Sequence, residues 1–474
     1  MTLPAKFVER VLRDLGETEG AALCAALDAE PPVSVRLNPA KTGAETVSAG
    51  PDAGLPVPEA AGLPALAIAG RVPWSRDGRY LAVRPSFTLD PDFHAGAYYV
   101  QEASSQFVGH LLAAVRTEGA RILDLCAAPG GKTTLYASLA GPDGLVVANE
   151  IDRRRASVLA DNVRKWGTGN VAVTTCEPRA LGDFEAWFDV VAVDAPCSGE
   201  GMFRKDPDAR GEWSEGNVKQ CAARQDEILR EAWRALKPGG TLVYSTCTFN
   251  RDEDEGALER MAAWAGDEIA ESEETAVEDA WGIVCGRVGA FRTFRFYPHR
   301  TCGEGFFAAV ARKSFDARGR VRTPKARRTV FAAVDRKTAG ELARWVRNPG
   351  GMRFAAVADT CYAWYAAQAD AVRTLSEALP VIYSGVALGQ VFKGVLKPDP
   401  ALAFFDGLNR GALPAAELDD EETLRFLRRQ DIAAGGLAEG MNLVCSRGRA
   451  LGFAKRIGAR VNNLYPNSLR IIKQ

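Results

Sequence analysis

Between residues 100 and 250 the chain alternates short, almost wholly apolar runs with amphipathic segments. The apolar runs are RILDL, GLVVANE, NVAVTT, FDVVAVD and TLVYST. The clearest helical segment begins at Ser214, a residue type that caps helices, and ends before Pro238 and Gly239. Strands that are apolar on both faces are typical of a parallel sheet with helices on each side. The pattern predicts a doubly wound, Rossmann-like α/β domain over residues 99–313.

The chain has 474 residues, which is too long for one ordinary core, so we expect several domains. A small N-terminal α+β domain is predicted over residues 1–98, with a loop at the Pro-, Gly- and Ala-rich stretch 49–66. The basic segment 314–328 predicts a linker. Beyond it, residues 329–395 predict a small α/β domain, and residues 396–474 a last domain of short strands and glycine turns.

The composition excludes several kinds of chemistry. Ten cysteines are scattered without a CxxC pair, and there are only three histidines. A disulfide framework, a metal site and a histidine-based triad are therefore poor hypotheses, and we expect no metal. There is neither an apolar run long enough to cross a bilayer nor a signal-peptide pattern, so we expect a cytoplasmic, membrane-free protein, by default a monomer. Catalysis would have to use Cys, Asp, Glu, Lys or an external cofactor.

The net charge is only −1, but the charges are segregated along the chain. Residues 312–328 hold eight basic residues and one acid, and residues 441–474 hold seven basic residues and no acid. Residues 252–279 hold twelve acids. This distribution fits a protein of which one face meets a polyanion. It also fits a plain linker and a solvated acidic helix, and composition alone does not choose between the two.

A glycine-rich turn follows the first apolar run. It consists of Cys126, Ala127, Ala128, Pro129, Gly130, Gly131, Lys132 and Thr133. Such a turn lets a cofactor approach the backbone closely, but it is not a phosphate-binding P-loop, because that spacing needs glycine at position 126. Glu150 ends the second run, where a carboxylate can hold a ribose diol. Both features also occur in unrelated Rossmann-like domains.

The fourth and fifth runs end in reactive side chains, Asp194 followed by Cys197 and, on the next run, Cys247. The carboxyl ends of parallel strands meet at one edge of a sheet, so we expect these residues to face one crevice. A single buried cysteine is usually structural, whereas two at neighbouring strand ends favour nucleophilic catalysis. A cation such as Lys132 or Lys205 would favour the reactive thiolate.

These residues resemble a known family. CAAPGGKT, the strand end at Glu150, DAPCSGEGMFRKDP and YSTCT resemble the Sun family of RNA 5-methylcytosine methyltransferases. Residues 94–105 and 296–313 resemble the edges of its catalytic domain. Residues 448–470 resemble the PUA-like tail of the RsmF type, which modifies small-subunit ribosomal RNA, and no NusB-like domain precedes the catalytic one as in the RsmB type. The resemblance implies an S-adenosylmethionine methyltransferase domain and a PUA-like domain over 396–474.

The resemblance also implies roles for individual residues. S-adenosylmethionine is expected against residues 126–132 and Glu150, and Asp194 is expected to contact both cofactor and cytosine. Cytosine C5 is a weak nucleophile until a thiolate adds to C6, and the resemblance assigns that addition to Cys247 and release to Cys197. The family usually has aspartate for the adenine where this chain has Glu177. DNA cytosine methyltransferases use the Pro-Cys cysteine, which leaves Cys197 as a rival nucleophile.

The implied partner is RNA, either 16S ribosomal RNA or the 30S subunit, with tRNA as an alternative substrate. A non-catalytic ribosome-assembly factor that binds RNA is the alternative from another class. The loop 199–213 carries Phe203, Arg204, Lys205 and Arg210, and is either an RNA clamp or a mobile surface loop. Predicted phosphate contacts are Arg204, Lys205, Lys455, Arg456 and Arg470.

Overall fold

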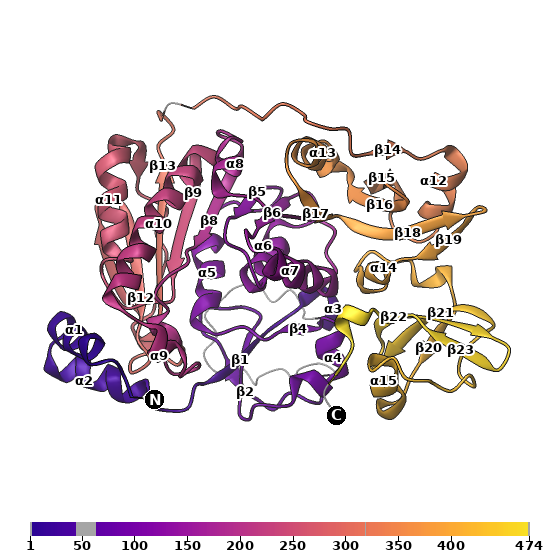
Figure 1. Cartoon of the computed structure of the whole chain (residues 1–474), viewed down its shortest axis with the longest axis horizontal. Helices are drawn as coiled ribbons and strands as arrows, with labels where there is room; N and C mark the ends of the chain where they lie inside the picture. The colour runs from indigo at the N-terminus through magenta and orange to yellow at the C-terminus, as the bar shows by residue number, and fades with distance from the viewer. Residues whose placement is uncertain (1, 44–62, 318, 473–474) are drawn as a thin grey trace.

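The computed structural model describes residues 2–43, 63–317 and 319–472, and its centre is a mixed sheet of ten strands (Figure 1). Most of the loop predicted at 49–66 lies outside the described residues. Five strands of this sheet run parallel, in the order β9 (Leu236–Thr246), β8 (Phe188–Asp194), β5 (Arg121–Asp124), β6 (Leu145–Asn149) and β7 (Val171–Thr174). The chain order reverses between β5 and β8, and ligands bind at such a switch point in open α/β sheets.

Helices cover both faces of the parallel strands, as the apolar runs predict. Consecutive strand residues belong to different cores: Ile122 packs in the cluster with Leu159, and Leu123 in the cluster with Leu229. The first cluster is formed with α5 (Phe107–Ala113), α6 (Gly131–Ala140) and α7 (Arg153–Trp166). The second is formed with α8 (Pro178–Gly182), α10 (Glu215–Ala235) and α11 (Glu255–Ala265). The predicted doubly wound α/β fold is confirmed.

Antiparallel strands extend the sheet at both edges. Beside β9 lie β13 (Phe306–Lys313), β12 (Phe291–Phe296) and β11 (Val284–Val288), and the short β10 (Ile269–Ala270) pairs with β13. At the far edge β17 (Val381–Ser384) pairs with β7, with Val381 opposite Thr174. The segment after the linker thus contributes a strand to the central sheet.

The N-terminal part contains two separate units. A four-stranded antiparallel sheet has the order β2 (Ile68–Arg71), β3 (Gly78–Leu81), β1 (Val33–Leu37) and β4 (Tyr98–Tyr99). The helices α1 (Ala5–Leu15) and α2 (Glu17–Ala26) lie apart from it, next to α9 (Ala209–Glu212) of the catalytic domain (Figure 1). Phe7 of α1 is buried against Phe203, Trp213 and Phe249, so this helical pair packs behind the catalytic strand ends.

Two further sheets lie toward the C-terminus. The first has the order β14 (Ala332–Ala333), β15 (Met352–Val357), β16 (Thr360–Tyr365), β18 (Val386–Phe392) and β19 (Val395–Pro398). The second has the order β20 (Ala415–Glu417), β21 (Gly440–Ser446), β22 (Arg449–Ile457) and β23 (Arg460–Asn463). The helices of this part are α12 (Arg336–Ala343), α13 (Ala369–Ala378), α14 (Pro400–Phe404) and α15 (Asp420–Leu427).

Ion pairs fasten the last sheet to the N-terminal part. Arg447 Nη1 lies 3.0 Å from Asp92 Oδ2, and Arg449 Nη1 lies 2.8 Å from Asp92 Oδ1. Asp92 belongs to α4 (Pro91–His94) and is buried. The last sheet therefore packs against the segment around α4. None of the helices in the described ranges is long and apolar enough to span a membrane.

Candidate active site

The ends of β8 and β9 bring the two predicted catalytic cysteines into contact. Cys197 Sγ and Cys247 Sγ are 3.3 Å apart, and both residues are half-buried. The Gly201 amide donates to the Cys247 carbonyl at 2.8 Å, and the Ala195 amide donates to the Ser245 carbonyl at 2.8 Å. These bonds link the segments that carry the two thiols.

Lys132 and Asp194 lie beside this pair. Lys132 Nζ is 2.9 Å from Asp194 Oδ2, and Ser245 Oγ donates to Asp194 Oδ1 at 2.8 Å. Burial alone would lower the pKa of Lys132, but Asp194, followed by Cys247, outweighs burial and raises this pKa. Of the two lysines considered for stabilising a thiolate, Lys132 interacts electrostatically with Cys247, whereas Lys205 is exposed and interacts with Glu304.

Two of the cysteines here are held as neutral thiols. The hydrogen bond with Cys247, and then burial, raise the pKa of Cys197 well above its usual range. Burial, reinforced by Asp124 and Asp194, raises the pKa of Cys126 as well. Both shifts favour the protonated thiol at these two positions.

The glycine-rich turn joins β5 to the first turn of α6. Gly130 has φ of 111°, and a Cβ there would lie 3.0 Å from Leu159 Cδ1, so the position requires glycine. The carbonyls of Ala128 and Pro129 accept hydrogen bonds from α7, at 3.1 Å from Arg155 and 2.8 Å from Asn162. These bonds to α7 fix the conformation of the turn. The first backbone N–H groups of α6 have no partners within the helix, as at any helix N-terminus, and can donate to a ligand.

The two other predicted cofactor carboxylates differ in their surroundings. Glu150 follows β6 and is buried, its Oε1 accepts from the Asp152 amide at 3.0 Å, and its Oε2 lies 3.2 Å from Arg155 Nη1. Glu177 stands at the N-cap position of α8, is exposed, and makes no side-chain capping bond. Glu150 thus lies at the strand end predicted for a ribose ligand, and Glu177 has a carboxylate facing solvent.

Known proteins match most of the chain. Three family models match the chain. The model for the N-terminal domain of 16S rRNA methyltransferase RsmF matches residues 3–103, and the model for 16S rRNA methyltransferase RsmB/F matches residues 111–312. The model for the methyltransferase RsmF PUA domain matches residues 414–471. Ribosomal RNA small subunit methyltransferase F of Shewanella loihica is 32% identical over 424 residues, 84% of this chain and 83% of the relative. The corresponding protein of Escherichia coli O81 is 32% identical over 424 residues, 84% of each chain.

The chain belongs to the ribosomal RNA small subunit methyltransferase F family.

Solved structures agree with this assignment. A methyltransferase homolog protein from Pyrococcus horikoshii is 26% identical with a TM-score of 0.52, covering 65% of this chain and 94% of its own. NSun6 from Pyrococcus horikoshii, solved with SFG, has a TM-score of 0.51 at 22% identity, covers 65% of this chain and 98% of its own, and is evidence for the fold alone. The predicted family, the methyltransferase fold, the PUA-like domain and S-adenosylmethionine as cofactor are confirmed.

One residue that fits the cofactor was missed in the sequence. Asp124 ends β5, is fully buried, and accepts from Thr133 Oγ1 at 2.6 Å, while its Oδ1 has no hydrogen-bond partner among the described residues. Burial, reinforced by Asp194 and Glu150, raises the pKa of Asp124 to about 7. This concentration of carboxylates suits S-adenosylmethionine, which carries a sulfonium and an ammonium group. The signal was present, since Asp124 is an acid at the end of an apolar run.

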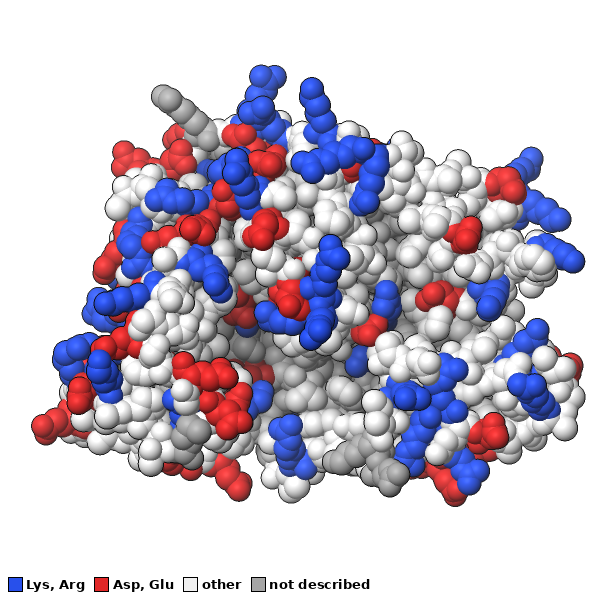
Figure 2. Space-filling model, viewed as in Figure 1, with Lys and Arg blue, Asp and Glu red and all other residues white. Residues whose placement is uncertain are grey.

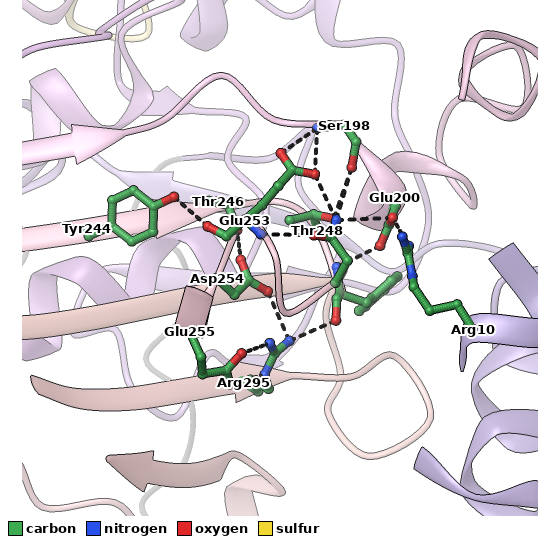
Figure 3. Close-up of polar contacts among 12 residues, drawn as sticks. Arg10, Ser198, Glu200, Tyr244, Thr246, Thr248, Glu253, Asp254, Glu255 and Arg295 are labelled. Atoms are coloured by element: carbon green, nitrogen blue, oxygen red, sulfur yellow. Dashed lines mark hydrogen bonds and ion pairs between the residues drawn. The ribbon is translucent and has the colours of Figure 1, made fainter. Parts of the chain in front are cut away.

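A buried polar network behind the two cysteines was also missed (Figure 3). Glu253 accepts from the Ser198 amide at 2.9 Å, Gln225 Nε2 at 2.9 Å and Asn250 Nδ2 at 2.7 Å. Asp254 accepts from Thr246 at 2.6 Å and pairs with Arg295 at 3.0 Å. Both carboxylates are fully buried although they lie in the acidic stretch 252–279, which composition alone places at the surface.

The predicted RNA-contact residues divide into two groups. Arg204 pairs with Glu304 at 3.0 Å, and Arg456 donates to the carbonyl of Leu437 at 2.6 Å, so protein groups already engage both guanidinium groups. Arg210 donates to Leu27 and Phe203 carbonyls, and Phe203 is buried, so the 199–213 loop is packed. The exposed members are Lys205, Lys455 and Arg470. Figure 2 shows basic and acidic side chains together around a hollow at the centre of one face.

Proposed function

We propose that this methyltransferase transfers a methyl group from S-adenosylmethionine to C5 of a cytosine in 16S ribosomal RNA, through a covalent bond between Cys247 Sγ and cytosine C6. The observation that carries the proposal is the contact of Cys197 and Cys247, 3.3 Å apart, beside the Lys132–Asp194 ion pair. The names of the relatives support small-subunit ribosomal RNA as the substrate.

In the first half of the reaction, an electron pair of the Cys247 thiolate forms the S–C6 bond, the π electrons of the ring shift toward N3, and N3 takes up a proton from solvent. Lys132 stabilises the thiolate before the attack, and Asp194 holds the proton at N3 as charge develops there. The ring then has enamine character at C5 and becomes a nucleophile. Bound S-adenosylmethionine supplies the electrophilic methyl group, and Asp124, Glu150 and the 126–132 turn would hold it.

In the second half, the C5 proton must leave and the C6–S bond must break. A solvent water molecule takes the C5 proton, the electron pair of the C5–H bond forms the C5–C6 double bond, and the sulfur of Cys247 departs with the electrons of the C6–S bond. The hydrogen bond with Cys247 and burial raise the pKa of Cys197, and its Sγ lies 3.3 Å from Cys247 Sγ, so Cys197 is placed to protonate the leaving thiolate. The same feature argues against Cys197 as the nucleophile.

RNA binding is assigned to the parts around the catalytic domain. We propose that residues 1–98, the linker 314–328 and the domains 329–395 and 396–474 orient the RNA, and that Lys205, Lys455 and Arg470 contact its phosphates. Single-stranded or loosened RNA is required because the cytosine must leave its stack to reach the thiols. We further propose that the enzyme acts as a cytoplasmic monomer.

The test is methyl transfer from labelled S-adenosylmethionine to purified 30S subunits, naked 16S RNA and tRNA. We expect label in ribosomal RNA as 5-methylcytosine, and its loss in Cys247→Ala. Label in tRNA alone would support the same methyl-transfer reaction with tRNA, and not ribosomal RNA, as the substrate. No label in any RNA, with the cofactor bound, would instead support a non-catalytic assembly factor.

A further inference from the structure

A single buried carboxylate connects the segments that carry the two thiols. Glu200 lies three positions after Cys197 and has no exposed surface. Its Oε2 accepts from the Phe249 amide at 3.1 Å, and its Oε1 accepts from Asn250 Nδ2 at 3.1 Å. Since Phe249 and Asn250 directly follow the Cys247 strand end, Glu200 bridges the two segments.

The positive charge that pairs with Glu200 comes from the N-terminal helix α1. Arg10 Nη2 contacts Glu200 Oε1, and the Arg10 guanidinium lies 5.2 Å from the centroid of the Trp213 ring. Trp213 Nε1 itself donates to Glu200 Oε1 at 2.9 Å. Figure 3 shows Arg10 reaching Glu200 from a helix at the side of the network. Arg10 is largely buried, with 13% of its side chain exposed, which leaves it poorly placed to bind RNA.

Phe7 fixes the helix that delivers this arginine. Its ring packs on Phe203 at 5.0 Å and on Phe249 at 6.5 Å between ring centroids, so it touches both segments that Glu200 bridges. A buried carboxylate that loses its cation carries a large desolvation cost, which destabilises the segments packed around it. Here these are the two catalytic segments.

We propose that Arg10 is a positioning residue for methyl transfer: through Glu200 it sets the spacing of the Cys197 and Cys247 segments. The helical pair at the N-terminus is then part of the catalytic core and not only an attachment for RNA. This inference rests on the proposed function, because it assumes that both thiols take part in the reaction.

The full-length protein tests it with five variants. Arg10→Met removes the positive charge at similar length, and Arg10→Lys keeps it. Glu200→Gln removes the negative charge, and Arg10→Met/Glu200→Gln removes both charges. Lys6→Met is the matched control, because Lys6 lies on the same helix and its ion pair with Glu215 is exposed. Two quantities are measured: kcat and KM for RNA, and the rate at which diamide, which accepts two hydrogens, oxidises Cys197 and Cys247 to a disulfide.

We expect Arg10→Met to lower kcat by about 10- to 100-fold with KM for RNA changed less than about twofold, because small misplacements of reacting groups have effects of this size. Disulfide formation should slow in the same variant and not in Lys6→Met. Arg10→Lys should recover part of kcat. The double variant should be no slower than Glu200→Gln alone, because Arg10 acts through Glu200.

Other outcomes overturn the inference. A raised KM with unchanged kcat would make Arg10 a phosphate contact, and unchanged kcat and thiol oxidation would remove it from the site. If Arg10→Met does not fold, Glu200→Gln with wild-type kcat and a wild-type oxidation rate would overturn the inference equally. Thiol oxidation needs neither RNA nor cofactor, so it still tests the spacing if the wild type methylates no cytosine C5.

Discussion

Lys132 Nζ lies 2.9 Å from Asp194 Oδ2, and this ion pair joins the cofactor turn at the start of α6 to the strand end that precedes Cys197. One cation therefore serves two groups of the proposed reaction, since Lys132 also interacts with Cys247. The cofactor turn and the nucleophile are coupled through this side chain.

Replacing Lys132 should therefore impair chemistry more than RNA binding. In Lys132→Met the Cys247 thiolate loses its neighbouring cation, so we expect kcat to fall by at least about 100-fold and the remaining activity to increase toward higher pH. The matched control is Lys205→Met, which removes an exposed lysine of the neighbouring loop. Single-turnover rates across pH 6–9 distinguish the two, and equal effects of both substitutions would contradict the role of Lys132.

The stability of the cofactor-free protein should depend on the protonation of Asp124. Its pKa is about 7 in the folded chain and near its ordinary value of 3.8 in the unfolded chain, so the folded state binds the proton more tightly. The free energy of unfolding should accordingly fall as pH rises from about 4 to 7. Asp124→Asn should remove this slope and increase the stability at pH 8 by about 1–3 kcal/mol.

Urea unfolding at pH 5 and pH 8 measures this effect. Asp370→Asn is the control, because the Asp370 side chain is 95% exposed. S-adenosylmethionine should also bind the wild type more tightly at pH 8 than at pH 6, since its positive groups favour the ionised carboxylate. A pH-independent stability difference between wild type and Asp124→Asn would contradict the assignment.

The cofactor turn should not tolerate a side chain at position 130. Gly130→Ala combines a φ of 111° with a contact to Leu159, so we expect a loss of about 1–3 kcal/mol in stability and weaker cofactor binding. Gly119→Ala is a matched control, because Gly119 also has positive φ but open space around its Cα. Calorimetric titration with S-adenosylmethionine should show a defect only in Gly130→Ala.

RNA binding should weaken with salt in proportion to the phosphate contacts. Replacing Lys205, Lys455 and Arg470 together by Met should reduce the slope of log K against log salt by about 2 to 3, since each contact contributes about 0.7–0.9. Arg456→Met should lower the stability of the fold instead, because Arg456 donates hydrogen bonds to the backbone carbonyls of Ala434 and Leu437. An unchanged slope in the triple variant would place the phosphate contacts elsewhere.

The central sheet and the catalytic strand ends could be predicted because both depend on local pattern. Apolar runs identify buried parallel strands, and the residues that follow them, such as Asp194, Cys197 and Cys247, must meet at one edge. Asp124 obeys the same rule and could have been found by applying it to every strand.

Other features depend on partners that are distant in the sequence. Glu200 is buried because Arg10 pairs with it, and Asp254 is buried because Arg295 does. Arg204 forms an ion pair with Glu304, which belongs to another segment of the chain. The addition of β17 to the edge of the central sheet likewise joins strands about 200 residues apart. No local pattern in the sequence reveals such pairings.

The roles of the two cysteines are tested most directly by trapping the covalent RNA complex. Wild type, Cys197→Ala and Cys247→Ala are incubated with S-adenosylmethionine and 16S RNA, and denaturing gels and peptide mass spectrometry identify the RNA-linked residue. The account predicts that Cys197→Ala accumulates a complex linked at Cys247, because the methylated adduct forms but is not released, and that Cys247→Ala forms none. A complex in Cys247→Ala linked through Cys197 would reverse the roles and contradict the account.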